Sequence, residues 1–486
     1  MSLTRRELFG ALAAAPLAGA AATRPNVIVI LMDDLGYGQF GPNSDTFTLD
    51  QLNPFIADRD KKETTPEAAL AAAKRATPNM TRLAAEGTRF TDAYVTSPLC
   101  APSRSALLTA RYPERFGVYV NTDVTRVGVP TDQLFLPQLL QKSGYATAAI
   151  GKWHVARMAG GMKKGLGQHP LERGFDYFFG FNSHGTEYYG SKILERNYEP
   201  AAAEGYTTDQ FTEEALGFLR RSKDRPFFLY LPYNAVHGPY GRLAPEVYLK
   251  RFDTGSRRID NFYAYLAAAD DGLGRIRKLL EEQGRARDTL IVLMSDNGAS
   301  GNTPMPSNGP FPGFKGQVWQ GGLRVPMAMW GPGIPAGKIC REPVISLDVL
   351  PTALAATGVG LPAGYRVDGR SVLPLLQGTQ NGPLHDGLFW AGELAQKWTG
   401  GANAPDDELT APPAWAARQG RWLLRYWSHL GRLELYDMET DKGERHDVAG
   451  EHPDVVRRLR TAYAAWYGQT AKPVAWPEAS WKKVAP

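Results

Sequence analysis

The 486-residue sequence predicts an α/β sandwich, in which a large and mostly parallel central sheet lies between helices, followed by a small C-terminal α+β domain. Three observations lead to this prediction. Short runs of apolar, β-branched and aromatic residues have the length of buried strands. Helical patterns fill the intervals between them, and such alternation is typical of parallel sheets. Beyond Gly378 the pattern changes to irregular segments that contain Pro and Trp.

Four strands are predicted in the main domain, and polar residues follow each of them at once. The strands are Asn26–Met32, Tyr145–Ile150, Phe227–Tyr233 and Leu290–Met294. The clearest helical patterns are Ala76–Glu86, Leu134–Ser143, Phe211–Ser222 and Asp260–Gln283. Because ligands bind at the carboxyl ends of strands in such sheets, the polar residues after the four strands are candidates for one site.

Two further segments have their own patterns. Residues 43–74 show no sustained periodicity and are predicted to form a surface excursion. In the last part of the chain, Trp422–Trp427 and Leu433–Tyr436 are expected to be strands, and Pro453–Tyr467 a helix. We therefore expect a main domain over residues 23–382 and the small α+β domain over residues 383–486.

Residues 1–22 form a candidate targeting segment. Arg5 and Arg6 precede the short apolar stretch Gly10–Ala18, and small residues follow. The segment resembles a bacterial twin-arginine signal, which implies transfer by the twin-arginine export machinery to the periplasm or the medium. A membrane anchor is the alternative, but the apolar stretch is well short of the roughly 20 residues that a spanning helix needs. No later stretch reaches that length, so no stable membrane span is expected.

Composition excludes some classes of protein. The formal net charge is only +5, and Lys and Arg are dispersed along the chain, which argues against a nucleic-acid partner. The two cysteines, Cys100 and Cys340, are few for an exported protein that depends on disulfides. Cys340 lies in no recognisable motif and is expected to be a small, partly buried residue.

Two acidic clusters follow predicted strands. Asp33 and Asp34 come directly after the first strand, and Asp296 and Asn297 after the fourth. Each cluster alone could be a solvated turn. Together they supply four oxygen ligands at strand ends, which suits Ca²⁺ or Mg²⁺.

Cys100 begins the segment Cys100–Arg104. Pro102 suits a first helical turn, so Cys100 is expected at a helix N-terminus, where the dipole favours an anionic nucleophile and lowers a thiol pKa. A buried structural cysteine is the alternative, but it leaves Arg104 unexplained.

Several cationic or titratable side chains follow the other strands or lie in loops. Singly, each is an ordinary exposed Lys or loop His; together with a nucleophile and a cation, they suit attack at phosphorus or sulfur. They are Lys152, His154, His237 and Lys315. Ser183 and His184 are added as candidate substrate-binding residues.

The motifs resemble those of the formylglycine-dependent sulfatases. Cys100–Arg104 is similar to the first signature of that family, and Gly144–His154 to the second. The similarity runs from Pro25 to about Trp466. It implies an alkaline-phosphatase-like fold with a sulfatase catalytic domain over residues 23–382.

The resemblance also implies a role for each residue. Cys100 would be converted to formylglycine by a maturation enzyme, and its hydrated form would attack sulfur and bind one divalent cation, Ca²⁺ in preference to Mg²⁺. The other ligands would be Asp33, Asp34, Asp296 and Asn297. Arg104 and Lys152 would hold the formylglycine, and Lys152 and Lys315 the sulfate oxygens. His237 would protonate the leaving alcohol, and His154 would take the proton that releases sulfate.

Three positions depart from the family pattern: Gln39, Ala110 and Gln320. None belongs to the proposed site, and we interpret them as packing changes. Similarity in Arg173–Asp176 and Ser307–Phe311 leans toward sulfatases of sulfated sugars such as galactosamine-6-sulfate enzymes. Trp319, Trp390 and Trp398 could stack on sugar rings or belong to the core.

Two other functions stay open. One is a phosphomonoester or phosphonate hydrolase of the same superfamily, which would be favoured by a second set of Asp and His ligands. The other is an inactive glycan-binding homologue, which would have little reason to keep every candidate catalytic group.

Overall fold

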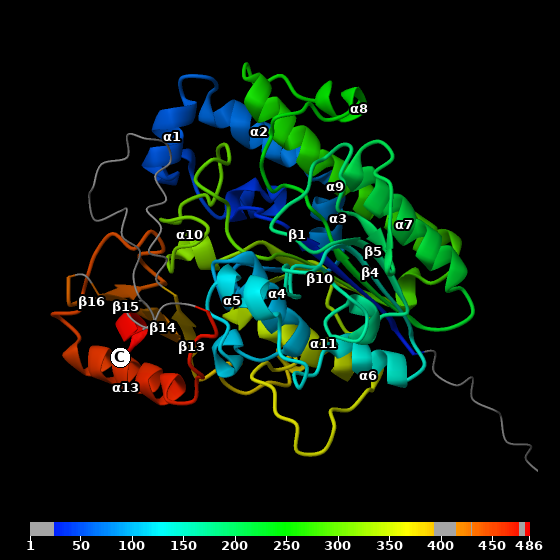
Figure 1. Cartoon of the computed structure of the whole chain (residues 1–486). Coiled ribbons are helices and arrows are strands. Elements are labelled where there is room, and N and C mark those ends of the chain that lie inside the picture. Colours follow the sequence, from blue (N-terminus) through cyan, green and yellow to red (C-terminus); the bar gives the residue numbers. More distant parts are fainter. Residues whose placement is uncertain (1–23, 393–414, 429, 476–481) are drawn as a thin grey trace, which may run out of the picture.

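The computed structural model describes residues 24–392, 415–428, 430–475 and 482–486. The predicted signal segment and Trp398 lie outside these residues. The core of the molecule is a ten-stranded sheet of order β11-β2-β10-β9-β1-β8-β4-β5-β6-β7 (Figure 1). Its strands are β1 (Asn26–Met32), β2 (Thr88–Phe90), β4 (Ala146–Lys152), β5 (Tyr177–Phe181), β6 (Glu195–Arg196), β7 (Glu199–Pro200), β8 (Phe227–Pro232), β9 (Thr289–Ser295), β10 (Met327–Trp330) and β11 (Lys338–Cys340).

The four predicted strands are adjacent at the centre of this sheet. They are β9, β1, β8 and β4, and all are parallel. Met32 of β1 pairs with Ser295 of β9, and Leu31 pairs with Pro232 of β8, so these three strands end side by side. The predicted α/β class with a mostly parallel sheet is confirmed, and β10, β6 and β7 add antiparallel pairs.

Helices cover both faces of the sheet (Figure 1). Alternate residues of β1 enter two separate cores: Ile28 and Ile30 pack in one, Val27 and Val29 in the other. This double burial explains why β1 is an unbroken apolar run. The first core contains residues of α2 (Pro66–Ala76), α3 (Pro78–Glu86), α7 (Thr207–Arg221), α8 (Glu246–Leu249) and α9 (Arg257–Glu282). The second contains residues of α4 (Cys100–Thr109), α5 (Asn121–Val127), α6 (Leu136–Lys142), α11 (Val349–Thr357) and α12 (Leu373–Leu376).

The predicted surface excursion over residues 43–74 contains two helices that were not predicted, and the second of them packs into the core. It contains α1 (Pro54–Asp60) and most of α2, which begins with Thr65 as a capping residue and Pro66 in the first turn. The face of α2 that packs toward α9 is made of alanines, among them Ala69 and Ala73. These alanines recur with the spacing of one helix face, but alanine marks a core face less clearly than larger apolar residues do.

The C-terminal part forms a four-stranded antiparallel sheet with one helix against it. The strands are β13 (Leu388–Ala391), β14 (Trp415–Gln419), β15 (Trp422–Trp427) and β16 (Arg432–Asp437), and the helix is α13 (Pro453–Tyr467). The predicted strands and helix are confirmed. The rings of Trp415 and Tyr463 stack 4.1 Å apart between sheet and helix.

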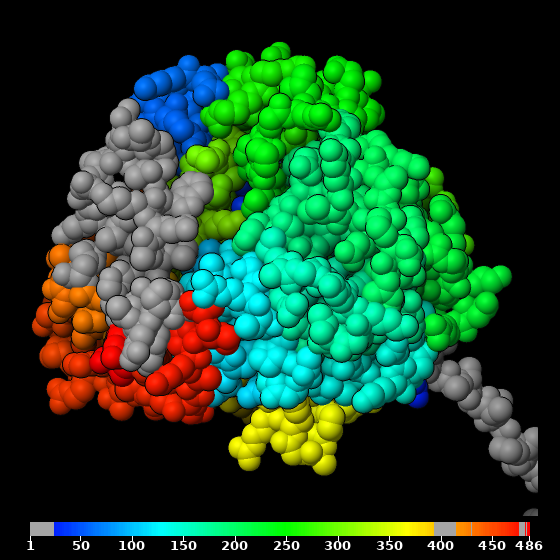
Figure 2. Space-filling view, viewed as in Figure 1, coloured from blue at the N-terminus to red at the C-terminus, as the bar shows by residue number. Residues whose placement is uncertain are grey.

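This small unit shares a core with the main domain. Tyr94, Leu99 and Val318 belong to the same buried cluster as Trp390 and Leu435. Figure 2 shows the red C-terminal segment lying directly against the cyan segment of the main domain. The two parts are therefore packed together. Among the described helices, none has the length and apolar character needed to cross a membrane.

Candidate active site

Candidate residues converge where the four central strands end. Asp33 and Asp34 follow β1, Asp296 and Asn297 follow β9, His237 follows β8, and Lys152 closes β4. The backbone joins these ends, since Asp33 N–H donates to the Ala235 carbonyl and Asp296 N–H to the Met32 carbonyl. Residues more than 260 positions apart in sequence thus lie at one edge of the sheet.

Asp34 connects the two acidic clusters. Its φ of 62° places it in the left-handed region, and its N–H donates to Asp296 Oδ1 at 3.1 Å. Asn297 Nδ2 donates to Asp34 Oδ1 at 2.7 Å. The turn after β1 is therefore held by the turn after β9.

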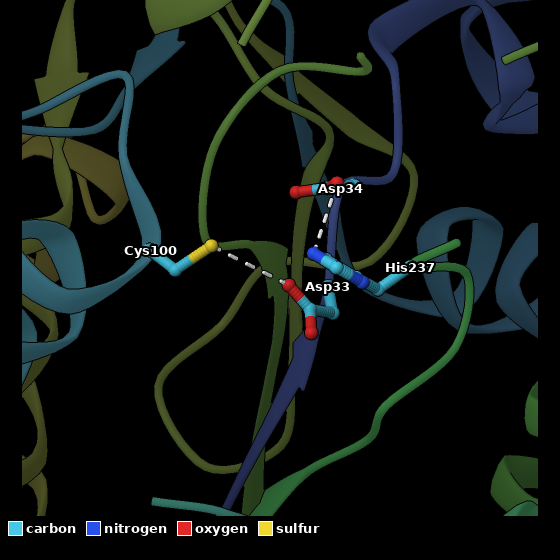
Figure 3. Close-up of side chains that lie close together, drawn as sticks. All are labelled: Asp33, Asp34, Cys100 and His237. Carbon is cyan, nitrogen blue, oxygen red and sulfur yellow. Dashed lines mark hydrogen bonds and ion pairs between the residues drawn. The ribbon is translucent and has the colours of Figure 1, made fainter. Parts of the chain in front are cut away.

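Four side chains offer metal-ligating atoms within 4.8 Å of one another: Asp33, Asp34, Cys100 and His237 (Figure 3). Cys100 Sγ lies 3.8 Å from Asp33 Oδ1, and His237 Nε2 lies 3.8 Å from Asp34 Oδ2. Among the described residues, this is the single group of at least three such side chains.

The donor set fits a hard divalent cation. Two of its four members are carboxylates, and Asp296 lies beside them. The buried Asn297 Oδ1 has no hydrogen-bond partner among the described residues, which leaves this oxygen for a ligand. Asp296 is engaged on both oxygens, by Asp34 N–H and by Arg104, but a carboxylate has further lone pairs. The other expected ligands, Asp33, Asp34 and Cys100, form one group with His237, which was not expected to be a ligand.

Three cations, the buried Lys152 and Arg104 and the partly exposed Lys315, neutralise the three carboxylates. Lys152 Nζ lies 2.7 Å from Asp33 Oδ2, and Lys315 Nζ lies 2.7 Å from Asp34 Oδ1. Arg104 donates to Asp296 Oδ2 through Nε at 2.9 Å and Nη2 at 2.7 Å, and through Nη1 to the Lys152 carbonyl. Arg104 thereby fixes the end of β4 to the end of β9.

These cations control the ionisation of the two aspartates. Burial alone would raise the pKa of Asp33, but Lys152, His237 and Arg104 hold that pKa below its usual value. Burial acts in the same way on Asp34, where Lys315 and His237 hold the pKa below its usual value. Both side chains are therefore ionised at neutral pH and ready to bind a cation.

Cys100 is the first residue of α4, as predicted, and its exposed fraction is 1%. The predicted lowering of its thiol pKa is wrong: burial raises this pKa to about 11, against the opposite effect of Lys152 and Lys315. Desolvation of a thiolate outweighs the field of the helix and of the nearby ammonium groups. The thiol is therefore protonated at neutral pH and is a weak nucleophile.

His154 is enclosed in the site. Its φ is 52°, and neither ring nitrogen has a hydrogen-bond partner among the described residues. Burial, together with Lys152 and His184, lowers its pKa well below the usual value. His154 is therefore neutral and has a nitrogen that can accept a proton.

Three other candidates lie toward solvent. His184 is exposed and meets His154 edge to face, with ring centroids 4.7 Å apart, and the half-exposed Ser183 precedes it in the loop after β5. The side chain of His237 is 23% exposed, and its Nδ1 lies 2.5 Å from the Gly238 carbonyl. With Nδ1–H donating there, Nε2 faces Asp34.

The departures from the family pattern have structural contacts. Gln39 accepts from Gly36 N–H and donates to the Pro304 carbonyl. Ala110 ends α4 with a φ of 53°, a conformation that favours glycine. Gln320 accepts from Tyr94 Oη at 2.7 Å.

Arg173–Asp176 and Ser307–Phe311, the two segments similar to sugar sulfatases, each contain a residue that supports a loop. Arg173 donates to the four backbone carbonyls of residues 129, 130, 131 and 133. Asn308 bonds both backbone groups of Ala299 and the Gly313 carbonyl, close to Lys315. Sequence reasoning missed Asn308 as a support of the site. Its signals were the similarity of Ser307–Phe311 to sugar sulfatases and a polar residue in a Gly- and Pro-rich stretch, which predicts a turn.

Comparisons with known proteins agree on one family. The sulfatase family model matches residues 25–359. An uncharacterized sulfatase of Escherichia coli (strain K12), YdeN, is 37% identical over 476 residues, which cover 90% of this chain and 84% of the relative. The N-acetylgalactosamine-6-sulfatase of Mus musculus is 32% identical over 392 residues, which cover 74% of this chain and 68% of that relative. The crystal structure of Ps i-CgsB in complex with k-i-k-neocarrahexaose is 28% identical, with a TM-score of 0.77 over 95% of this chain and 98% of that one.

Proposed function

This chain belongs to the sulfatase family and hydrolyses sulfate esters, and from this premise we propose that its substrate is a sulfated carbohydrate. Support comes from the mouse relative, named for a sulfated amino sugar, and from the structural neighbour that holds a neocarrahexaose. The observation that carries the proposal is the set of Lys152, Lys315 and two histidines around Cys100, because these groups suit an anionic ester with a poor leaving group.

We propose that Cys100 acts after oxidation to formylglycine. The thiol itself is protonated at neutral pH, since burial raises its pKa to about 11. The oxidised residue supplies an oxygen nucleophile in place of the thiol. Arg104 and Lys152, whose groups surround Cys100 and Asp33, would hold that residue.

We propose one divalent cation, Ca²⁺ in preference to Mg²⁺, bound by Asp33, Asp34, Asp296, Asn297 and the residue derived from Cys100. The cation would polarise the reacting oxygen. The unpartnered Asn297 oxygen and the two ionised aspartates support this set.

The remaining side chains divide the proton transfers and the binding of sulfate. Lys315 and Lys152 would hold sulfate oxygens, because their ammonium groups pair with the adjacent Asp34 and Asp33 beside Cys100. His237, at the exposed side, would donate a proton from Nε2 to the departing alcohol when both of its ring nitrogens are protonated. His154, neutral and unpartnered, would accept a proton when sulfate is released. Ser183 and His184 would contact the rest of the substrate.

Export and maturation form a separate part of the proposal. Residues 1–22 would direct the chain through the twin-arginine machinery to the periplasm or the medium, after a formylglycine-generating enzyme has acted on Cys100. The domain boundary near residue 383 is likewise proposed, supported by the separate antiparallel sheet that begins with β13.

A direct test is to co-express the full chain with a formylglycine-generating enzyme and measure sulfate and phosphate release from matched esters. Sulfated mono- and oligosaccharides, aryl sulfates and the corresponding phosphates should be compared, with Cys100→Ala as control. Sulfate release from a sugar ester, with formylglycine found in the peptide that contains residue 100, is the expected result. Faster phosphate release would favour the phosphomonoesterase alternative, and saccharide binding without hydrolysis would favour the glycan-binding one.

A further inference from the structure

An arginine is fully buried in the C-terminal sheet. Arg425 lies in β15, its exposed fraction is 0%, and its guanidinium carbon lies 3.6 Å from the centroid of the Trp319 ring. Its Nη2 lies 2.5 Å from Glu444 Oε2. Because a buried ion pair often stabilises a fold no better than apolar residues do, its presence here calls for another explanation.

The same pair contacts the main domain at a second point. Glu444 Oε1 accepts a hydrogen bond from Gln320 N–H at 3.1 Å. Gln320 begins α10 (Gln320–Leu323), directly after Trp319. The Arg425–Glu444 pair therefore holds two consecutive residues of the main domain, one by stacking and one by a hydrogen bond.

Trp319 closes the base of the loop that contains Lys315. A Cβ atom added to Gly313 would lie 2.4 Å from Trp319 Cβ, and the φ of Gly313 is 77°, so the chain approaches as closely as glycine allows. Gly321 N–H also donates to the Pro312 carbonyl at 2.7 Å. A shift of Trp319 would therefore move this loop.

The loop in turn sets the place of Lys315. Lys315 N–H donates to the Ala299 carbonyl at 3.0 Å, and Gly316 N–H donates to the Pro98 carbonyl at 2.8 Å. These bonds join the loop to the turn after β9 and to the segment before Cys100. From this position Lys315 Nζ reaches Asp34.

We propose that Arg425 and Glu444 are positioning residues that hold Lys315 in the active site through Trp319. The inference rests on the proposed role of Lys315 in binding sulfate oxygens. It assigns to the C-terminal sheet a part in the reaction, although no residue of this pair reaches the reacting atoms. Arginine suits the task because its planar group stacks on an indole and pairs with a carboxylate at once.

The test is a double-mutant cycle in the calcium-loaded, formylglycine-bearing enzyme. Arg425→Met should lower kcat/KM for a sulfate ester about tenfold in the otherwise unchanged protein, but less than about twofold in the Lys315→Ala background. Arg425→Lys should rescue little, because an ammonium group cannot reproduce the stacked, paired geometry. Equal losses in both backgrounds would mean a purely structural role and would overturn the inference.

A binding measurement extends the test to variants whose turnover is too slow to measure. In the calcium-loaded Cys100→Ala protein, calorimetry with inorganic sulfate should give a Kd that Arg425→Met, or Glu444→Gln if the former fails to fold, weakens about tenfold. Arg421→Met is the matched control, since Arg421 pairs with Asp437 on the exposed side of the same sheet. If both the Arg425 and the Glu444 variants bind sulfate as well as the Cys100→Ala parent does, the positioning role alone is refuted. If the Cys100→Ala parent itself does not bind sulfate, the proposed site is refuted.

Discussion

Asn297 donates through Nδ2 to Asp34 Oδ1 at 2.7 Å, while its own buried Oδ1 has no partner among the described residues. A bound cation would use this oxygen. We expect Asn297→Ala to weaken calcium binding at least about tenfold, since removing a ligand or its support commonly has such an effect. Calorimetry with CaCl₂, and the rise in Tm that calcium produces, would measure it.

Asn261→Ala is the matched control, because Asn261 is also buried but lies outside the candidate site, where it bonds backbone groups of residues 240, 242 and 244. It should leave the calcium affinity unchanged. Stoichiometric zinc in the purified protein, or equal calcium affinity of Asn297→Ala and the parent, would contradict the assigned site.

If His237 and His154 have the proposed roles, their variants should differ in their dependence on substrate. Protonation of the leaving oxygen matters for a sugar alcohol and much less for a nitrophenolate, so His237→Ala should lose far more activity on a sugar sulfate than on an aryl sulfate. The step proposed for His154 follows the departure of the alcohol, so His154→Ala should slow both alike. Steady-state kinetics with both esters would measure the difference, and His446→Ala, at an exposed position, should change neither. The same substrate dependence for both variants would refute the division of roles.

Glu114 should make stability fall as pH rises. Its carboxyl oxygens are buried without a hydrogen-bond partner among the described residues, and burial raises its pKa well above the usual 4.5. Above pH 4.5 the folded protein therefore binds a proton that the unfolded chain has lost, and stability decreases with pH. We expect Glu114→Gln to be about 1–3 kcal/mol more stable than the parent at pH 8.

Calorimetric Tm values at pH 4 and pH 8 test this. At pH 4 the variant and the parent should agree, because Glu114 is protonated in both states, and the exposed Glu67→Gln should match the parent at either pH. A constant difference between Glu114→Gln and the parent at both pH values would exclude the titration as its cause.

Arg104 should be important for stability, and a lysine at this position should not reproduce its contacts. Two of its nitrogens hold Asp296 Oδ2 and a third holds the Lys152 carbonyl, a geometry that one ammonium group cannot reproduce. Arg104→Met leaves a buried carboxylate unpaired, and we expect a loss of about 3–5 kcal/mol in the free energy of unfolding. Denaturant unfolding would measure it. Arg82→Met, which breaks an exposed pair with Glu86, should cost less than about 1 kcal/mol.

The central sheet could be predicted because its strands are short apolar runs that end in polar clusters, as Asn26–Met32 followed by Asp33 shows. The convergence of these clusters follows from parallel pairing, which places all carboxyl ends at one edge. Helix α2 was not predicted, although its buried alanines have helical spacing, because alanine marks a core face less clearly than larger apolar residues do.

The charge state of Cys100 and the environment of Trp319 could not be predicted either. The helix N-terminus was visible in the sequence, but the depth of burial that raises the thiol pKa depends on the packed fold. Trp319 was expected to stack on sugar or to lie in the core. It is buried, and its partner Arg425 is more than 100 positions away, in a sheet whose docking no local pattern reveals.

The order of the strands determines when the central sheet can form during synthesis of the chain. β1 has β8 and β9 as its neighbours, and the latter emerges roughly 190 residues after Cys100. At about 5–20 residues per second, that interval lasts on the order of 10–40 s. Until β9 arrives, the centre of the sheet cannot close and Cys100 stays within reach of another protein. Once it has closed, Cys100 is fixed as the first residue of α4 with 1% exposure, so an enzyme that needs an extended segment around it would have to act within that window.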